Sequence, residues 1–417
     1  MNLATLTLKS LASRRWTVIL TVFSIAVSVL LVLGVERLRH DARSSFASTV
    51  SGTDLIVGAR TGQVQLLLYS VFRIGNPTAN ISWKSHADFA RDPRVRWTVP
   101  LALGDSHQGY RVVGTSAGYF DHYRYAGGRK LEIEDGKRFT ELFDVVIGAE
   151  VADALGYRVG SAVVIEHGLG GGINKHERLP FVVAGVLAPT GTPVDRTLHV
   201  SLEGLEAVHV DFGPARRAPG RELDADALRG LDLQPRSITA FLVGLKSKTA
   251  IFGLQRDIGN YRGEPLMAIL PGVAMHELWS TVAVAETALG AVALCVLVSA
   301  FLGMTTMLLA GLNERRREMA VLRAVGAGPR HIAALLVLEA AMLSAAGAVA
   351  GLAAITVFYA LFAEQVGQAY GLYLNRTWPA PDELALAAGA VAAGALAGLV
   401  PALRAARQSL ADGLKAG

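Results

Sequence analysis

Four long apolar segments constrain this chain more strongly than any other feature of its sequence. They cover residues 17–35, 282–312, 332–362 and 384–403, and the first contains no ionisable side chain. A helix needs about 20 residues, at about 1.5 Å per residue, to cross the roughly 30 Å hydrocarbon core of a bilayer. Apolar runs of this length are rare among the buried helices of soluble proteins. The sequence therefore predicts four transmembrane helices.

Basic residues beside these segments predict their orientation, because Lys and Arg in short flanks are retained on the cytoplasmic side. They precede the first segment, fill the loop after the second and follow the fourth. These residues are Lys9, Arg14, Arg15, Arg315, Arg316, Arg317, Arg323, Arg330, Arg404, Arg407 and Lys415. Both termini are therefore expected inside the cell. The first segment shows no small-residue cleavage pattern, which favours an uncleaved anchor over a signal peptide.

The predicted fold is an α-helical membrane protein with a large mixed α/β domain inserted between the first and second spans. The predicted layout is an interfacial amphipathic N-terminus (1–15), a first span (16–35), an extracytoplasmic domain with stalk helices (36–281), a second span (282–312), a cytoplasmic coupling helix (313–331), a third span (332–362), an outer loop (363–383), a fourth span (384–403) and a cytoplasmic tail (404–417).

Composition agrees with this hybrid character. The chain is 52% hydrophobic and 18% charged, too apolar for a wholly soluble protein and too polar for a bundle of spans alone. Its net charge of +5 is concentrated where membrane topology explains it, so nucleic acid is not an expected partner. The single cysteine, Cys295, lies in the second apolar segment, which excludes an internal disulfide.

Short apolar runs in the inserted region predict strands. A glycine-terminated helix, Ala149–Gly156, is expected between the first two of them. The charged stretch Arg216–Pro235 is expected to be a surface excursion. The predicted strands cover 144–148, 162–165, 181–187, 197–200 and 238–245.

The first and second spans are expected to continue beyond the membrane as paired stalks. Leu38, Ala42 and Phe46 keep a helical stripe after the first span, and no helix breaker occurs between Val273 and Ser280. A flexible tether would be rich in glycine or proline. The charged residues Glu36, Arg37 and Arg39 are expected simply to continue the first helix outward.

The loop 313–331 mixes charged and apolar residues at helical spacing, and Gly326, Gly328 and Pro329 follow as stop and start signals. Its string Glu314-Arg-Arg-Arg-Glu-Met-Ala-Val-Leu-Arg-Ala-Val-Gly-Ala327 closely resembles the cytoplasmic motif of the MacB/LolC/FtsX family of ABC transporter permeases. The order of spans, the segments 146–156 and 181–187, and the closing Pro401–Arg407 resemble that family too. The chain departs from the pattern at Gln408 and Ser409, where relatives often carry Asp-Pro.

The resemblance implies a dimeric permease, with a second copy or a paralogue, in the bacterial inner membrane with its large domain in the periplasm. It also implies two copies of a separate ATPase that binds ATP and Mg²⁺, so no cofactor is expected in this chain. The residues expected to contact the ATPase are Glu314, Arg316, Arg317, Glu318 and Arg323. Family members export or extract envelope material, with a periplasmic adaptor or a lipoprotein as a further partner. Regulation of an extracytoplasmic enzyme, as in the FtsX branch, is the alternative.

Within the spans, small residues four apart permit close helix packing. These pairs are Ser299 with Gly303, Gly347 with Gly351, and Gly394 with Gly398. Glu339 is an intramembrane acid, which costs about 2.5 kcal/mol or more without a partner. Packing or a hydrogen bond is the preferred interpretation over transport chemistry.

Two further hypotheses concern chemistry in the inserted domain. Nine of the ten histidines fall there, and His167 with His176, which flank a glycine-rich run, form the best candidate zinc pair, which would suit a metal-handling system. A G-x-S-x-G string makes Ser116 a candidate nucleophile, but the aromatic, charged run after it is a poor nucleophile-elbow helix. No G-x-x-x-x-G-K-[ST] string occurs, so the chain is not expected to be an enzyme, and ATP hydrolysis is expected in the partner.

Overall fold

The structure is a computed structural model, and it describes residues 14–49, 51–168, 179–210, 228, 230–314, 319, 321, 323–324, 326–370 and 379–407. The chain divides into two compact units. The helical unit comprises residues 1–42, 282–367 and 374–417, and the inserted domain comprises residues 43–281 with 368–373.

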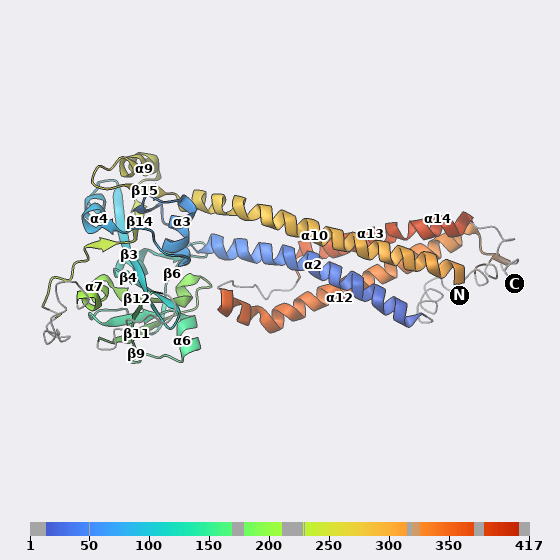
Figure 1. Cartoon of the computed structure of the whole chain (residues 1–417), viewed down its shortest axis with the longest axis horizontal. Coiled ribbons are helices and arrows are strands. Elements are labelled where there is room, and N and C mark those ends of the chain that lie inside the picture. Colours follow the sequence, from blue (N-terminus) through green and yellow to red (C-terminus); the bar gives the residue numbers. More distant parts are fainter. Residues whose placement is uncertain are drawn as a thin grey trace. The chain divides into compact units, whose positions relative to one another are not determined.

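Long apolar helices make up the helical unit (Figure 1). They are α2 (Arg15–Ser48), α10 (Pro271–Glu314), α12 (Pro329–Tyr370), α13 (Pro381–Ala397) and α14 (Leu399–Arg407). Four stretches, 15–41, 271–312, 329–363 and 381–407, are long and apolar enough to cross a membrane. The prediction of four spans is therefore confirmed. Proline at the first position suits α10, α12 and α13, because its missing N–H is not needed there.

The helices of this unit enclose a common apolar core. Ile25 of α2, Met304 of α10, Leu343 of α12 and Ala390 of α13 belong to one buried cluster. A second cluster, near the loop between α10 and α12, joins Leu312 to residues of α12 and α14.

The inserted domain is built on one mixed sheet (Figure 1), as the sequence predicted. The strand order is β15-β1-β14-β3-β4-β12-β8-β11-β7, with β10 paired to β3 and β9 to β11. Only β12 with β4 and β11 with β8 run parallel among the described pairs of this sheet. The strands of this sheet are β1 (Leu55–Ala59), β3 (Val95–His107), β4 (Tyr110–Thr115), β7 (Ile133–Gly136), β8 (Asp144–Ile147), β9 (Ala162–Val163), β10 (Glu166–His167), β11 (Phe181–Leu187), β12 (Thr197–Ser201), β14 (Ala240–Leu245) and β15 (Leu266–Ile269).

Smaller elements pair outside this sheet or cover it. Two short ribbons are β2 (Ile81–Ser82) with β13 (Ser237–Ile238), and β5 (Arg124–Tyr125) with β6 (Arg129–Lys130). The helices are α3 (Gln63–Leu67), α4 (Trp83–Ala90), α5 (Gly118–His122), α6 (Ala149–Leu155), α7 (Leu202–Val210) and α9 (Ile251–Gly259), with a π-helical turn at Leu68–Phe72 and 3-10 turns at Pro193–Arg196 and Lys248–Ala250. In Figure 1, α4 and α9 lie at the β14–β15 end, and α6 and α7 lie at the β11–β12 end.

The apolar runs read from the sequence correspond to β8, β9, β11, β12 and β14, so these strand predictions are confirmed. The predicted helix is also present, as α6, and Gly156 caps it with a φ of 67°, which glycine adopts without strain. Of the surface excursion predicted at 216–235, residues 228 and 230–235 are described, and there Leu228 and Leu233 are buried in an apolar cluster of the domain, so this part of the prediction was wrong. The rest of the excursion and most of the glycine-rich run after His167 lie outside the described residues.

The sequence did not predict β1, β3, β4, β7, β10 and β15 of this sheet, and the long strand β3 lies inside it, between β14 and β4. In β3, Pro100 and Gly104 interrupt the alternation of apolar and polar residues that usually indicates a strand. Pairing with β4 and β14 on its two edges holds this 13-residue strand in place.

Candidate coupling, packing and metal-binding sites

The predicted coupling region is described only in part. Gly326 has a φ of 104°, which favours glycine, and α12 begins three residues later at Pro329. The Arg323 guanidinium donates from Nη2 to the carbonyl oxygen of Ala406 in α14, at 3.2 Å. Met319 packs on the cluster that contains Leu312. The part of the chain that the structure describes does not include Arg316, Arg317, Glu318 or the side chain of Glu314.

The predicted packing pairs differ in what surrounds them. A Cβ placed on Gly347 would lie 2.6 Å from Ile25, and one on Gly351 would lie 2.8 Å from the carbonyl oxygen of Ala26, so α12 approaches α2 closely. Gly394 and Gly398 of the α13 segment face Ser344 and Ala340 of α12 in the same way.

The third pair lies on a more open surface. Apart from its chain neighbours and the backbone of its own helix, no described residue has a heavy atom within 4 Å of a Cβ built on Gly303. The Ser299 hydroxyl donates to its own helix, to Cys295 O at 2.8 Å.

Glu339 is 1% exposed in α12 and has a basic neighbour. A small cavity is lined by Glu339, Arg14, Gly311 and Leu336, and Arg14 Nη2 donates to the carbonyl oxygen of Gly311 at 3.4 Å. A buried carboxylate beside a guanidinium is far less costly than an isolated one. This surrounding agrees with a structural role for Glu339.

The first helix continues through Arg37, as expected, but Arg37 also forms an ion pair that the sequence did not predict. Its guanidinium is bidentate on Glu383 of α13, with Nε to Oε1 at 2.6 Å and Nη2 to Oε2 at 2.9 Å. Both side chains are 7% exposed, and the Arg37 guanidinium lies 4.7 Å from the Tyr359 ring centroid. Burial is possible because each charge meets its counter-ion. One signal was present in the sequence, since Arg37 closely follows the first apolar segment and Glu383 precedes the fourth.

The helices α2 and α10 contact each other at several places, and two of these contacts involve residues of α2 beyond the first apolar segment. Within the helical unit, Arg39 Nε lies 3.6 Å from Glu286 Oε2. Within the inserted domain, the Arg43 guanidinium lies 5.7 Å from the Trp279 ring centroid. Each helix is unbroken through these contacts.

One end of the inserted domain gathers Asp105, His167 and His209. Asp105 Oδ1 accepts a hydrogen bond from His167 Nδ1 at 2.7 Å, and Asp105 Oδ2 lies 3.4 Å from His209 Nε2. Burial alone would raise the pKa of Asp105, but these two histidines outweigh burial and lower its pKa to about 2. Burial lowers the pKa of His209, yet Asp105 reverses that effect, and the net pKa is raised. His176 lies outside the described residues.

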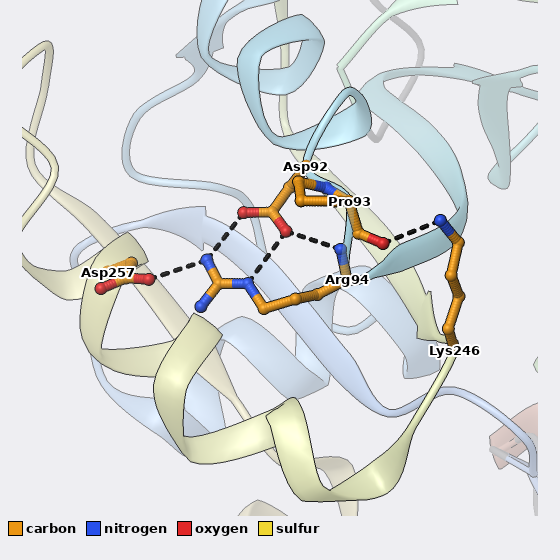
Figure 2. A network of polar contacts seen from close by, with 5 residues as sticks. All are labelled: Asp92, Pro93, Arg94, Lys246 and Asp257. Atoms are coloured by element: carbon orange, nitrogen blue, oxygen red, sulfur yellow. Dashed lines mark hydrogen bonds and ion pairs between the residues drawn. The ribbon is translucent and has the colours of Figure 1, made fainter.

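A polar network secures α9 to the start of β3 (Figure 2). The Arg94 guanidinium donates to Asp92 Oδ2 and to Asp257 Oδ2, both at 2.7 Å, and Lys246 Nζ donates to the carbonyl oxygen of Pro93 at 2.7 Å. The hydrogen bond from Arg94 lowers the pKa of Asp92. The network joins three segments of the chain, at residues 92–94, 246 and 257, so we interpret it as structural.

Ser116 stands just before α5, a helix of five residues that buries Tyr119 and Phe120. Behind a nucleophile elbow, a longer packed helix is expected. The neighbouring His122 stacks on Trp97, with ring centroids 4.6 Å apart. This local structure gives a hydrolase reading of Ser116 no support.

This architecture consists of helices long enough to span a membrane and a mixed α/β domain inserted after the first of these helices. It is typical of a class of membrane permease. Two family models match the chain: the MacB-like periplasmic core domain over residues 18–259 and the FtsX-like permease C-terminal over residues 290–410. The chain belongs to the MacB/FtsX-type family of ABC transporter permeases.

Individual relatives are more distant. The pyoverdine export ATP-binding/permease protein PvdT of Pseudomonas syringae pv. tomato is 24% identical over 368 residues, 79% of this chain and 48% of PvdT. The chain thus spans about half the length of that relative. The match to the periplasmic region of MacB from Actinobacillus actinomycetemcomitans has a TM-score of 0.34 and 11% sequence identity, and it covers 55% of this chain and 94% of the MacB chain. The match to the extracellular domain of YknZ from Gram-positive bacteria has a TM-score of 0.31 and 16% sequence identity, and it covers 52% of this chain and 99% of the YknZ chain.

Proposed function

We propose that this chain is a permease subunit that transmits ATP-driven conformational change from a separate cytoplasmic ATPase to its inserted domain. Two ATPase copies, which bind ATP and Mg²⁺, act on a pair of permease chains. The inserted domain lies in the periplasm and works on material of the cell envelope, which it exports or extracts.

The pairing of α2 with α10 is the observation that carries this proposal. Each helix is continuous from its apolar span into the inserted domain, and the two contact each other at Arg39 with Glu286 and at Arg43 with Trp279. A continuous helix transmits displacement along its axis, whereas a glycine-rich linker absorbs it. Paired helices therefore suit a mechanical connection.

The interior of the helical unit supports work outside the spans. A cavity of about 280 Å³ lies among α2, α10 and α13, and its lining is almost wholly apolar. Val29, Leu33, Leu294 and Ala390 are among the residues that line it. Hydrophilic solutes need polar groups along their path. We infer that the cargo is moved or released by the inserted domain.

The cargo class rests on the family and on the relative PvdT, whose name states that PvdT takes part in pyoverdine export. By analogy, we propose a cargo taken from the periplasm or from the outer face of the inner membrane. A periplasmic adaptor protein or a lipoprotein is the partner that such a route requires.

The test reverses charge in the coupling loop with Arg316→Glu combined with Arg317→Glu. The expected result is loss of ATPase co-purification and of permease-stimulated ATP turnover, because an acidic loop no longer matches the same ATPase surface. Membrane insertion, measured by protease accessibility in sealed vesicles, is expected to stay unchanged.

Arg330→Glu is the control, since it makes one substitution of the same type in the same loop but outside the family string. Its side chain is exposed at the start of α12. Equal co-purification and turnover in the double variant and in the control would refute the proposed contact.

A further inference from the structure

We propose that Asp105, His167 and His209 form a binding site for a divalent transition-metal ion, and that zinc is the ion which this donor set suits best. The carboxylate and imidazole atoms of these residues all lie within 4.8 Å of one another. The site lies wholly within the inserted domain and does not depend on the proposed transport function.

Three separate elements supply the side chains. Asp105 is near the end of β3, and His167 is opposite it on the antiparallel partner β10. Residues directly opposite in such a pair point to the same face of the sheet. His209 comes from the last turn of α7, which packs on β4 and β12. The tertiary fold therefore collects the three groups on one face.

The geometry is near that of a metal centre. Zinc bonds of about 2.0–2.1 Å place tetrahedral donor atoms about 3.3 Å apart. The two separations that involve the Asp105 oxygens are 2.7 Å and 3.4 Å, and the two imidazole rings stack with centroids 4.8 Å apart. Small rotations of the histidines, whose side chains are 34% and 32% exposed, are enough to seat an ion between them.

The surrounding structure orients the donors as it does in known metal sites. A hydrogen bond links the His209 ring to the backbone of Leu205, one turn earlier in α7, while Nε2 faces Asp105. Metal-binding histidines commonly use their second ring nitrogen in this way. On the other side, the Ser106 hydroxyl donates to Gly168 O, and Gly168 N donates to Gly104 O at 3.1 Å. These bonds hold β10 against β3.

The donor types select the kind of ion. Two imidazoles and one carboxylate suit zinc and its neighbours among the transition metals, whereas calcium and magnesium prefer oxygen ligands throughout. The carboxylate is 3% exposed and the histidines face solvent, so an ion can enter from the histidine side. Three protein ligands leave a tetrahedral ion one position for water or another ligand.

Another histidine, on β3, is distinguished from this site. His107 lies on β3 but is engaged elsewhere, with Nδ1 2.6 Å from Val164 O and Nε2 2.9 Å from Tyr157 Oη. His176, which the sequence paired with His167, is outside the described residues. The geometry assigns His209 as the second imidazole.

The experiment uses the full chain, purified in mild detergent with a histidine-free affinity tag and stripped with a chelator. Zinc is titrated in competition with a chromophoric chelator, and cobalt serves as a spectroscopic probe. We expect about one equivalent of each ion per chain and cobalt d–d absorption typical of tetrahedral coordination. We also expect zinc to raise the melting temperature, because an ion that binds only the folded state stabilises it.

The variants His167→Gln, His209→Gln and Asp105→Asn are each expected to weaken zinc binding by about 100-fold or more, since loss of even a supporting partner typically costs about 10- to 100-fold. His122→Gln is the matched control, because His122 belongs to the same domain and stacks on Trp97. It is expected to bind zinc as the wild type does. If His167→Gln or Asp105→Asn fails to fold, His209→Gln, which changes a residue at a helix end, still tests the assignment.

Several outcomes would overturn the site. One is the absence of stoichiometric zinc or cobalt binding by the wild-type chain. Another is wild-type affinity in both His167→Gln and His209→Gln. A third is retained binding in His209→Gln together with loss in His176→Gln, which would restore the pair suggested by the sequence.

Discussion

At the scale of single residues, the helical unit contains a buried ion pair between Arg37 and Glu383, in which each charged group has the other as its partner in place of water. Arg37 and Glu383 are 346 positions apart in the chain, and Asp41, at 3% exposure, is a further buried charge of α2. Burying charges costs several kcal/mol each, and bidentate geometry is what offsets that cost. The pair is therefore expected to matter most when only one partner is removed.

Arg37→Met and Glu383→Leu are each expected to lower the free energy of unfolding by about 3–5 kcal/mol, because each leaves a buried charge unpaired. The double variant is expected to be less destabilised than the sum of the two. Thermal unfolding of the detergent-purified wild-type chain, the two single variants and the double variant measures these stabilities as a double-mutant cycle. Arg39→Met is the control, since Arg39 is 42% exposed and an exposed pair contributes about 0–1 kcal/mol. Strict additivity of the single effects would contradict the argument.

At the scale of elements, local pattern predicted helices and strands that are apolar throughout or that carry their own cap. The spans and β11 are continuous apolar runs, and α6 carries its own glycine cap, so each could be read without knowing its neighbours. The strand β3 could not, because it contains Pro100 and Gly104 and is fixed by partners on both edges. Register and pairing of the short ribbons likewise depend on the rest of the sheet.

Helix packing offers a prediction at this scale, from two glycines with different surroundings. Gly347→Leu is expected to destabilise the chain by about 1–3 kcal/mol, because the new side chain overlaps Ile25 and forces α12 away from α2. Gly303→Leu is expected to leave the stability of the single chain nearly unchanged. Unfolding in detergent compares the two variants.

If Gly303 lies where a second permease copy packs, Gly303→Leu should instead reduce dimer formation in crosslinking. Equal destabilisation by the two substitutions would show that the contrast between their surroundings does not govern packing.

At the scale of the whole molecule, the proposal requires the inserted domain and the C-terminal tail to lie on opposite sides of the membrane. Cys295 is the only cysteine, so a Cys295→Ala background allows single reporters. Arg256→Cys, exposed on α9, is expected to react with a membrane-impermeant maleimide in intact cells stripped of their outer membrane. Lys415→Cys is expected to react only after permeabilisation. Labelling of both reporters from the same side would refute the proposed orientation.

The sequence by itself determined the number of spans, their order, the place of the inserted domain and the family string. Length, hydrophobicity and flanking charge are local properties, and the bilayer acts on each segment separately. The tertiary structure decided which distant polar groups meet: Arg37 with Glu383, and His167 with Asp105 and His209. Such meetings follow from sheet pairing and helix packing, which depend on every element at once. The sequence therefore gave His167 as a metal candidate, while only the fold supplied Asp105 and His209 as its companions.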